Sequence, residues 1–137
     1  MEYPLLVESY GFVADSGGAG KHRGGLGLRR VVRPVGHTMT FSGQGERFVN
    51  RPWGIFGGGS GGTGKFVKLS GGAEVPLPTK PANLEVKASE AVVVETPGAG
   101  GYGPPAGRDP DAVARDLAEG VITRDVAQQA YGVGADT

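Results

Sequence analysis

The sequence predicts a mainly β protein: a glycine-rich β domain, barrel- or sandwich-like, followed by a short C-terminal helical hairpin. The chain of 137 residues contains 27 glycines and 10 prolines, and short apolar runs recur between them, as in a turn-rich β fold. After a break at residues 98–107, "GAGGYGPPAG", the apolar residues change to a helical period. We therefore expect a β domain over residues 1–103 and a helical hairpin with a tail over residues 104–137.

The expected strands follow in order along the first segment. Residues 3–13, "YPLLVESYGFV", predict a strand that ends at a turn, and residues 27–35, "GLRRVVRPV", predict a second strand whose arginines face water or a partner. Further strands are expected at 37–43, 65–72 and 90–98, with a long glycine loop at 51–64. The prolines at positions 76, 78 and 81 favour an extended edge or a connection over a central strand.

Capping residues predict the two helices. Asp109 is a suitable N-cap with Pro110 at the first helical position, and Gly120 ends this helix. Thr123 caps a second helix that stops at Gly132. The two helices together form the expected hairpin.

Composition and charge exclude several classes of protein. Fourteen basic and fourteen acidic residues balance, and there is no cysteine, so we expect neither a disulfide nor a thiolate metal site. The start, "MEYPLLVESYG", does not have the form of a signal peptide, and no run reaches membrane-spanning length. We expect a soluble, cytoplasmic protein without a membrane partner.

Residues 15–27, "DSGGAGKHRGGLG", permit two interpretations. Consecutive glycines can direct backbone N–H groups into an anion-binding nest, to which Lys21 and Arg23 would add charge. Alternatively, the stretch is a tight turn whose basic side chains are solvated.

Motifs for nucleotide, metal and DNA binding are incomplete. Residues 59–65, "GSGGTGK", match a phosphate-binding loop only up to Lys65, because Phe66 stands where a Ser or Thr should bind magnesium. His22 and His37 are the only histidines, too few for the usual zinc or iron site. We therefore expect no catalytic, cofactor-binding or metal-binding residue in this chain.

The C-terminal helices have the length of a helix-turn-helix, but their charge opposes DNA binding. Residues 108–137 contain three basic and six acidic side chains, so phosphate repulsion would hinder docking. We expect no nucleic-acid partner.

Several longer motifs point to a family. In this order, "DSGGAGKHRGGLG", "RPWGIFGG", "ETPGAGGYG", "RDPDAVARDLAEGVIT" and "YGV" closely resemble the C-terminal portion of the hydantoinase B family. That family also includes the second half of 5-oxoprolinases and subunits of ATP-dependent ketone carboxylases such as acetophenone carboxylase. The resemblance runs from about Tyr3 to Val133; it departs at Ala99, which interrupts the glycine run, and at Pro104, which replaces an acidic residue.

The resemblance implies a small non-catalytic subunit of a hetero-oligomer. It would dock on larger hydantoinase A-like and hydantoinase B-like subunits of an ATP-dependent cyclic-amide hydrolase or ketone carboxylase, and those partners would hold ATP and a divalent metal. The residues that bind metal and lie near substrate in the family belong to its larger N-terminal part, which has no match here. Substrate, reaction type and stoichiometry stay undefined, as does whether the glycine-basic turn reaches the active site.

The candidate interface or anion contacts are Asp15, Lys21, His22, Arg23, Trp53, Phe56 and Tyr102. We expect Lys21 and Arg23 to pair with carboxylates across an interface, and the three aromatic residues to act as contact anchors, with ordinary core packing as their alternative. Two other interpretations remain open: a free-standing anion- or DNA-binding module, and a truncated fragment without a function of its own.

Overall fold

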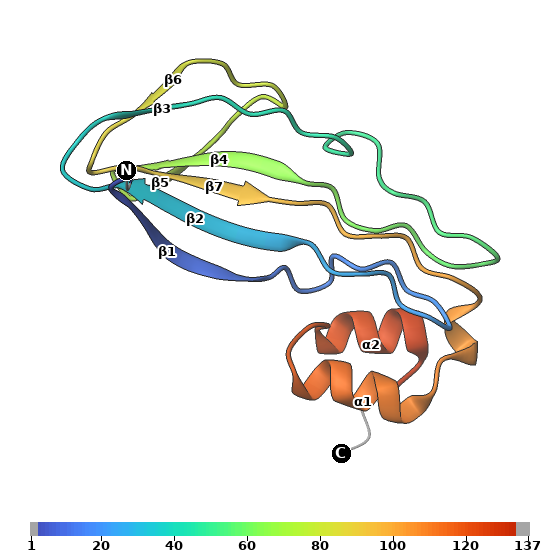
Figure 1. Cartoon of the computed structure of the whole chain (residues 1–137). Helices are drawn as coiled ribbons and strands as arrows, with labels where there is room; N and C mark the ends of the chain where they lie inside the picture. Colours follow the sequence, from blue (N-terminus) through green and yellow to red (C-terminus); the bar gives the residue numbers. More distant parts are fainter. Residues whose placement is uncertain (1–2, 134–137) are drawn as a thin grey trace.

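The computed structural model describes residues 3–133 and confirms the mainly β class with a C-terminal pair of helices (Figure 1). The elements in chain order are β1 (Leu5–Phe12), β2 (Leu28–Pro34), β3 (Met39–Phe41), β4 (Lys65–Ser70), β5 (Ala73–Pro76), β6 (Leu84–Val86), β7 (Ala91–Glu95), a 3-10 turn η1 (Pro105–Gly107), α1 (Pro110–Ala118) and α2 (Arg124–Tyr131). The predicted division at residues 103 and 104 stays a prediction, and the tail at 134–137 lies outside the described residues.

Five strands form an antiparallel sheet in the order β1-β2-β7-β4-β5, and β3 pairs with β6 in a second, two-stranded sheet. The proline-containing connection accordingly provides an edge strand, β5, as its prolines indicate. It also contains β6, which the sequence pattern does not predict because that strand is only three residues long and its pairing partner β3 lies far away in sequence.

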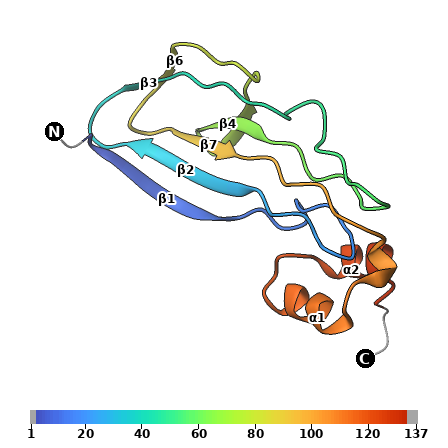
Figure 2. The ribbon, with the colours of Figure 1, turned by 45° about the vertical axis from the view of Figure 1, so that its right-hand side comes forward.

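The small sheet covers only part of one face of the large sheet. Phe66 of β4 lies on this face and packs against Phe41 of β3 and against Phe48, with ring centroids 5.5 and 4.8 Å apart. In Figure 2, β3 and β6 lie over the side of the sheet that contains β4 and β7, away from β1. The opposite face contains a buried cluster formed by Val31, Val67, Ala91 and Val93.

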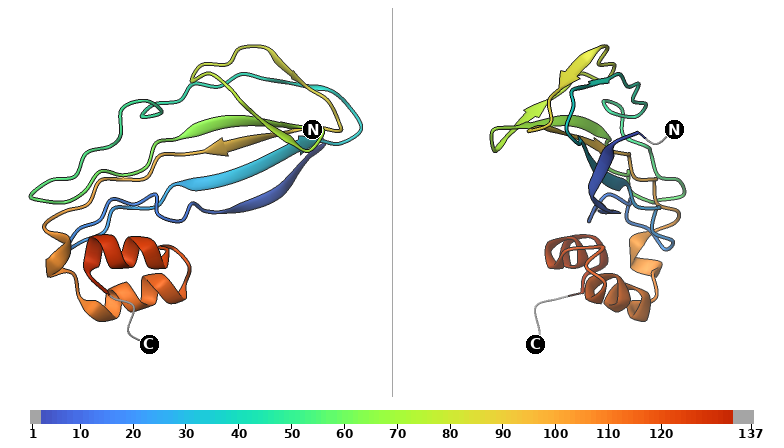
Figure 3. Two further views of the ribbon diagram at one scale, coloured as in Figure 1. Left: turned by 180° about the vertical axis from the view of Figure 1, so that it is seen from behind. Right: turned by 60° about the vertical axis from the view of Figure 1, so that its left-hand side comes forward.

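Three glycine-rich segments continue from the strands as extended chain without regular secondary structure (Figures 1 and 3). Residues 13–27 join β1 to β2, residues 51–64 lead into β4, and residues 96–104 follow β7. Each segment hydrogen-bonds to both others through the main chain: Gly18 N–H donates to the Ala99 carbonyl at 2.8 Å, Gly59 to Ala19 at 2.7 Å, and Gly101 to Gly59 at 2.9 Å. We call these three segments the glycine lattice.

The lattice requires glycine because its backbones approach too closely for a side chain. A Cβ on Gly18 would lie 2.2 Å from the Gly59 carbonyl oxygen, and a Cβ on Gly98 would lie 1.8 Å from that of Ser16. Neither glycine has a positive φ, so close approach, and not a left-handed conformation, explains the residue type. Glycine at these lattice positions therefore reflects packing between segments distant in sequence.

The helices begin and end where the capping residues predict. Asp109 accepts a hydrogen bond from the Asp111 amide, Thr123 accepts one from Val126, and Gly132 closes α2 with φ +66°. Val113, Ile122 and Ala127 form a separate small core between the helices. Among residues 3–133, no helix combines the length and apolar character needed to cross a membrane.

A pair of glycine substitutions tests the lattice. Gly100→Ala would place a Cβ 1.9 Å from the Trp53 carbonyl oxygen and should lower the free energy of unfolding by about 1–3 kcal/mol, as overpacking does. Gly25→Ala is the matched control because its Cβ would meet only Ala99 Cβ, at 4.0 Å. Urea unfolding followed by circular dichroism measures both variants. Equal stability of the two would contradict the close-approach explanation.

Candidate functional site

The glycine-basic turn at residues 15–27 is held by hydrogen bonds within the chain. The amides of Gly18, Lys21, His22 and Gly24 donate to backbone carbonyls of residues 99, 103, 102 and 18. These four N–H groups are therefore not free to converge on an anion, and the geometry here is that of a turn embedded in the lattice.

Arg23 lies next to Asp116 of α1, 93 residues away in sequence. Its Nε and Nη2 donate to the two carboxylate oxygens at 3.0 and 3.3 Å, and Arg108 Nη2 donates to Asp116 Oδ2 at 2.6 Å. All three side chains are largely buried. Arg23 thus has its carboxylate partner inside the same chain, whereas the sequence led us to expect that partner across an interface.

The three side chains form an ion cluster that joins the lattice to the helices. Burial acts to raise the pKa of Asp116, but hydrogen bonds and charge from Arg23 and Arg108 outweigh it and hold that pKa below its usual range. Arg108 also lies over the Tyr131 ring of α2, with its guanidinium carbon 5.8 Å from the ring centroid. The cluster fixes both helices against the turn.

Asp15 and Lys21 lie in different places. Asp15 accepts a hydrogen bond from the Thr123 amide at 2.8 Å, so it supports the start of α2. Lys21 lies beside Gly103 and Gly107, where it would contact a Cβ built on either glycine. The structure therefore does not gather these two residues with Arg23 into one site.

His22, Phe56 and Tyr102 are brought together at one end of the lattice. Tyr102 forms bridges with both His22 and Ile55, and its ring centroid lies 6.0 Å from His22 and 5.3 Å from Phe56. Phe56 has φ +51° in a turn closed by a Gly58-to-Ile55 hydrogen bond of 3.0 Å, and its side chain is exposed. A large side chain in this backbone conformation is strained, and the turn holds its ring toward solvent.

Trp53 belongs to a neighbouring pair. The guanidinium of Arg47 lies 4.6 Å from the centroid of its ring, a cation–π contact. Trp53, Phe56 and Tyr102 are all exposed, which leaves them available as contact anchors and argues against core packing in this chain.

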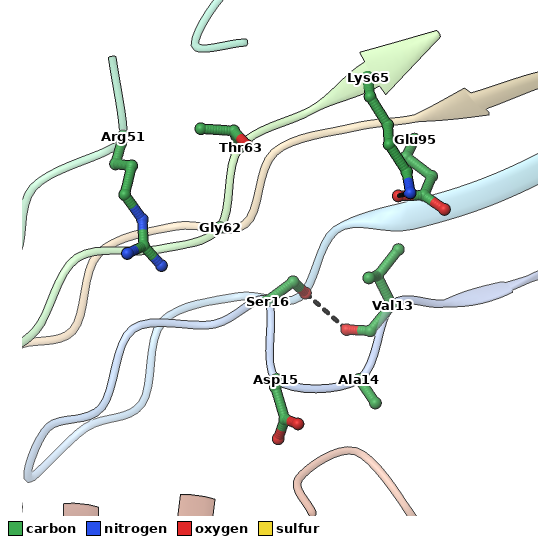
Figure 4. Close-up of a pocket in the computed structure, with 9 residues that line it drawn as sticks. All are labelled: Val13, Ala14, Asp15, Ser16, Arg51, Gly62, Thr63, Lys65 and Glu95. Carbon is green, nitrogen blue, oxygen red and sulfur yellow. Dashed lines mark hydrogen bonds and ion pairs between the residues drawn. The ribbon is translucent and has the colours of Figure 1, made fainter. Parts of the chain in front are cut away.

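An open cavity of about 490 Å³ lies where the lattice meets the sheet (Figure 4). Most of its polar side chains already have partners: Ser16 Oγ donates to the Val13 carbonyl at 2.6 Å, Arg51 Nε donates to Gly61 at 2.9 Å, and Lys65 Nζ lies 3.4 Å from Glu95. Glu95 also pairs with Arg29. The charged side chains that line the cavity therefore balance, and most of its polar groups are bonded to other parts of the chain. These bonds stabilise the junction between the lattice and the sheet.

No cluster of three or more His, Cys, Asp or Glu side chains within residues 3–133 could hold a metal ion. The site that stands out is a surface: every residue of β1 is exposed.

The apolar side chains of β1 are Leu5, Leu6, Val7, Tyr10 and Phe12, each between 43 and 67% exposed. Soluble monomers rarely leave so many neighbouring large apolar side chains open to water. The sequence pattern predicts the strand but not its exposure. The available signal was that "LLVESYGF" does not alternate cleanly, as expected of a strand covered on both faces.

The chain matches the family model of hydantoinase B/oxoprolinase over residues 1–105. It belongs to this family. An uncharacterized protein of Methanocaldococcus jannaschii is 38% identical over 96% of this chain and 23% of its own length. The beta subunit of caprolactamase from Pseudomonas jessenii is 33% identical over 98% of this chain and 24% of its own length. The alpha subunit of acetone carboxylase from Xanthobacter autotrophicus is 32% identical over 97% of this chain and 22% of its own length.

The fold agrees with this family membership. The crystal structure of ATP-dependent caprolactamase from Pseudomonas jessenii superposes with a TM-score of 0.78 at 29% identity, covering 98% of this chain and 24% of that one. The chain thus spans about a quarter of the length of these three relatives.

Removing the central carboxylate tests the ion cluster. Asp116→Asn would leave two largely buried guanidinium groups without their counter-charge and should lower the free energy of unfolding by about 3 kcal/mol. Glu119→Gln, an exposed change at the end of the same helix, is the control and should have little effect. Chemical unfolding measures both.

Acid should act on the same cluster. Because the folded-state pKa of Asp116 is lowered, its contribution is complete above the unfolded pKa and is lost as pH falls through the folded one. The difference in stability between the original chain and Asp116→Asn should therefore shrink toward low pH. A difference that stays constant would contradict the assignment.

Proposed function

We propose that this chain is a small non-catalytic subunit that docks on larger hydantoinase A-like and hydantoinase B-like subunits of an ATP-dependent assembly. The reaction class would be hydrolysis of a cyclic amide or carboxylation of a ketone. Relatives named as the beta subunit of a caprolactamase, as a subunit of a D-/L-hydantoinase and as the alpha subunit of acetone carboxylase support this class. A cytoplasmic location is part of the proposal.

The observation that carries the proposal is the exposed apolar surface of β1. Burial of apolar side chains drives association, and aromatic residues such as Tyr10 and Phe12 are frequent anchors at interfaces. A second exposed group, Phe56 with Tyr102 and His22, lies at the far end of the lattice and provides a second contact. The partners would bind ATP and a divalent metal.

The anion- or DNA-binding module is the weaker candidate. The amides of the glycine-basic turn are engaged with carbonyls, and Arg23 is neutralised by Asp116. A truncated fragment without its own function would share the same surface but would form no stable assembly.

Coexpression tests the proposal. The tagged chain should copurify with a hydantoinase A-type chain and with a hydantoinase B-type chain that lacks its own copy of the matched segment, in a fixed ratio and at a much larger mass than the chain alone. Phe12→Ser should weaken this association by about tenfold or more, because truncating a buried aromatic anchor costs about 2 kcal/mol. Val75→Ser, an exposed apolar position on the other edge strand β5, is the control and should have no effect.

Each alternative has its own outcome in that experiment. A monomer that binds inorganic phosphate or duplex DNA would favour the free-standing module. A monomer that binds neither these nor the larger chains would favour the fragment.

A further inference from the structure

The backbone of β1 has an open side. Among the strands of residues 3–133, β1 pairs only with β2. Two hydrogen bonds flank this pairing: the Val35 amide donates to the Pro4 carbonyl at 2.9 Å, and the Val13 amide donates to the Gly27 carbonyl at 2.8 Å. Antiparallel pairs alternate between bonded and non-bonded. The two flanking bonds fix which pairs in the register are hydrogen-bonded. From this alternation, the amides of Val7, Tyr10 and Phe12 belong to non-bonded pairs and point away from β2, toward the open edge.

A bulge aligns the apolar side chains along that edge. The register of β1 against β2 shifts between Val7 and Ser9. As a result, four apolar residues of β1 lie opposite alternate residues of β2 and therefore share one face of the sheet. These pairs are Leu5 with Pro34, Val7 with Val32, Tyr10 with Arg30 and Phe12 with Leu28. Without the bulge, Ser9 and Gly11 would occupy that face in place of Tyr10 and Phe12. Leu6 is exposed on the other face, so both faces of β1 present apolar surface.

The other edge of the same sheet is protected. On β5, the Leu77 amide donates to the Phe66 carbonyl at 3.0 Å, so Pro76, opposite Val67, stands at an outward position and offers no N–H group there. β5 is also only four residues long and contains Glu74. Proline, charge and short length are the usual means by which proteins block an edge. β1 has eight residues, no proline and a single charge, Glu8, which pairs with Arg33 at 2.6 Å.

We infer that β1 is an interior strand of a composite sheet, whose next strand comes from the part of the hydantoinase B-type fold outside the segment that this chain matches. The inference rests on the proposed function and specifies how the chain docks. The main chain of β1 would pair with a strand of the partner, and the side chains of Leu5, Val7, Tyr10 and Phe12 would pack against the partner. The relatives are about four times as long as the matched segment, which supplies the source of that strand. The small sheet of β3 and β6 covers β4 and β7 and does not extend over β1, so the face of β1 is open to the partner (Figure 2).

Hydrogen exchange on the assembly tests the inference. When the chain binds the hydantoinase A-type chain and a B-type chain that lacks its own copy of the matched segment, the amides of Val7, Tyr10 and Phe12 should exchange about 100-fold or more slowly than in the free chain. The outward amide of Glu74 on the protected edge is the internal control and should keep its rate. Slow exchange of the β1 amides at raised concentration of the chain alone would instead identify a second copy as the occupant and overturn the inference.

A proline substitution separates main-chain pairing from side-chain contact. Tyr10→Pro removes an outward N–H group and the ring, whereas Tyr10→Thr removes only the ring. Tyr10→Pro should bind the larger chains about tenfold more weakly than Tyr10→Thr, with both variants retaining the circular dichroism of the original chain. Equal binding of the two variants, or an assembly in which the β1 amides exchange as in the free chain, overturns strand addition but leaves the proposed function standing. Failure to form the assembly at all overturns both.

Discussion

Direct packing of backbone against backbone in the glycine lattice is the constraint on which the rest of the structure depends. Each of its three segments extends a strand or a strand pair, and each bonds to the other two through main-chain groups. Amide and carbonyl groups far from regular secondary structure are thereby satisfied without side chains. The lattice sets the positions of the aromatic group at its end and of Arg23 beside the helices.

The remaining parts of the molecule attach to this frame in different ways. The helical pair has its own small core and is fixed to the lattice by the ion cluster of Asp116 with Arg23 and Arg108. The small sheet is attached by aromatic packing around Phe66. β1 has one paired edge, and all eight of its residues are exposed. The exposed apolar side chains of β1 are the pattern expected of a surface that another protein covers.

Local patterns were sufficient for some features of the fold. The helix ends follow from Asp109, Thr123 and Gly132 because a cap acts within a few residues of itself. The strand positions follow from short apolar runs between turns. The mainly β class with a C-terminal helical pair could therefore be predicted without a structure.

Features that depend on distant segments could not be predicted in the same way. The sequence indicates that Arg23 needs a carboxylate but not that Asp116, 93 residues away, provides it. Glycines that suggest flexible turns are in fact required where segments far apart in sequence touch. The exposure of β1 was missed because the side on which Tyr10 and Phe12 lie depends on a bulge that appears only when β1 pairs with β2.

Amide exchange of the lattice glycines tests the central claim most directly. Gly18, Gly59 and Gly101 lie in no helix or strand, yet each donates a main-chain hydrogen bond between segments. If the lattice is a packed frame, these amides in the isolated chain exchange as slowly as those of the buried strand β7. Exchange at the rate of an unstructured glycine peptide would show that the segments are loose loops and would contradict the account.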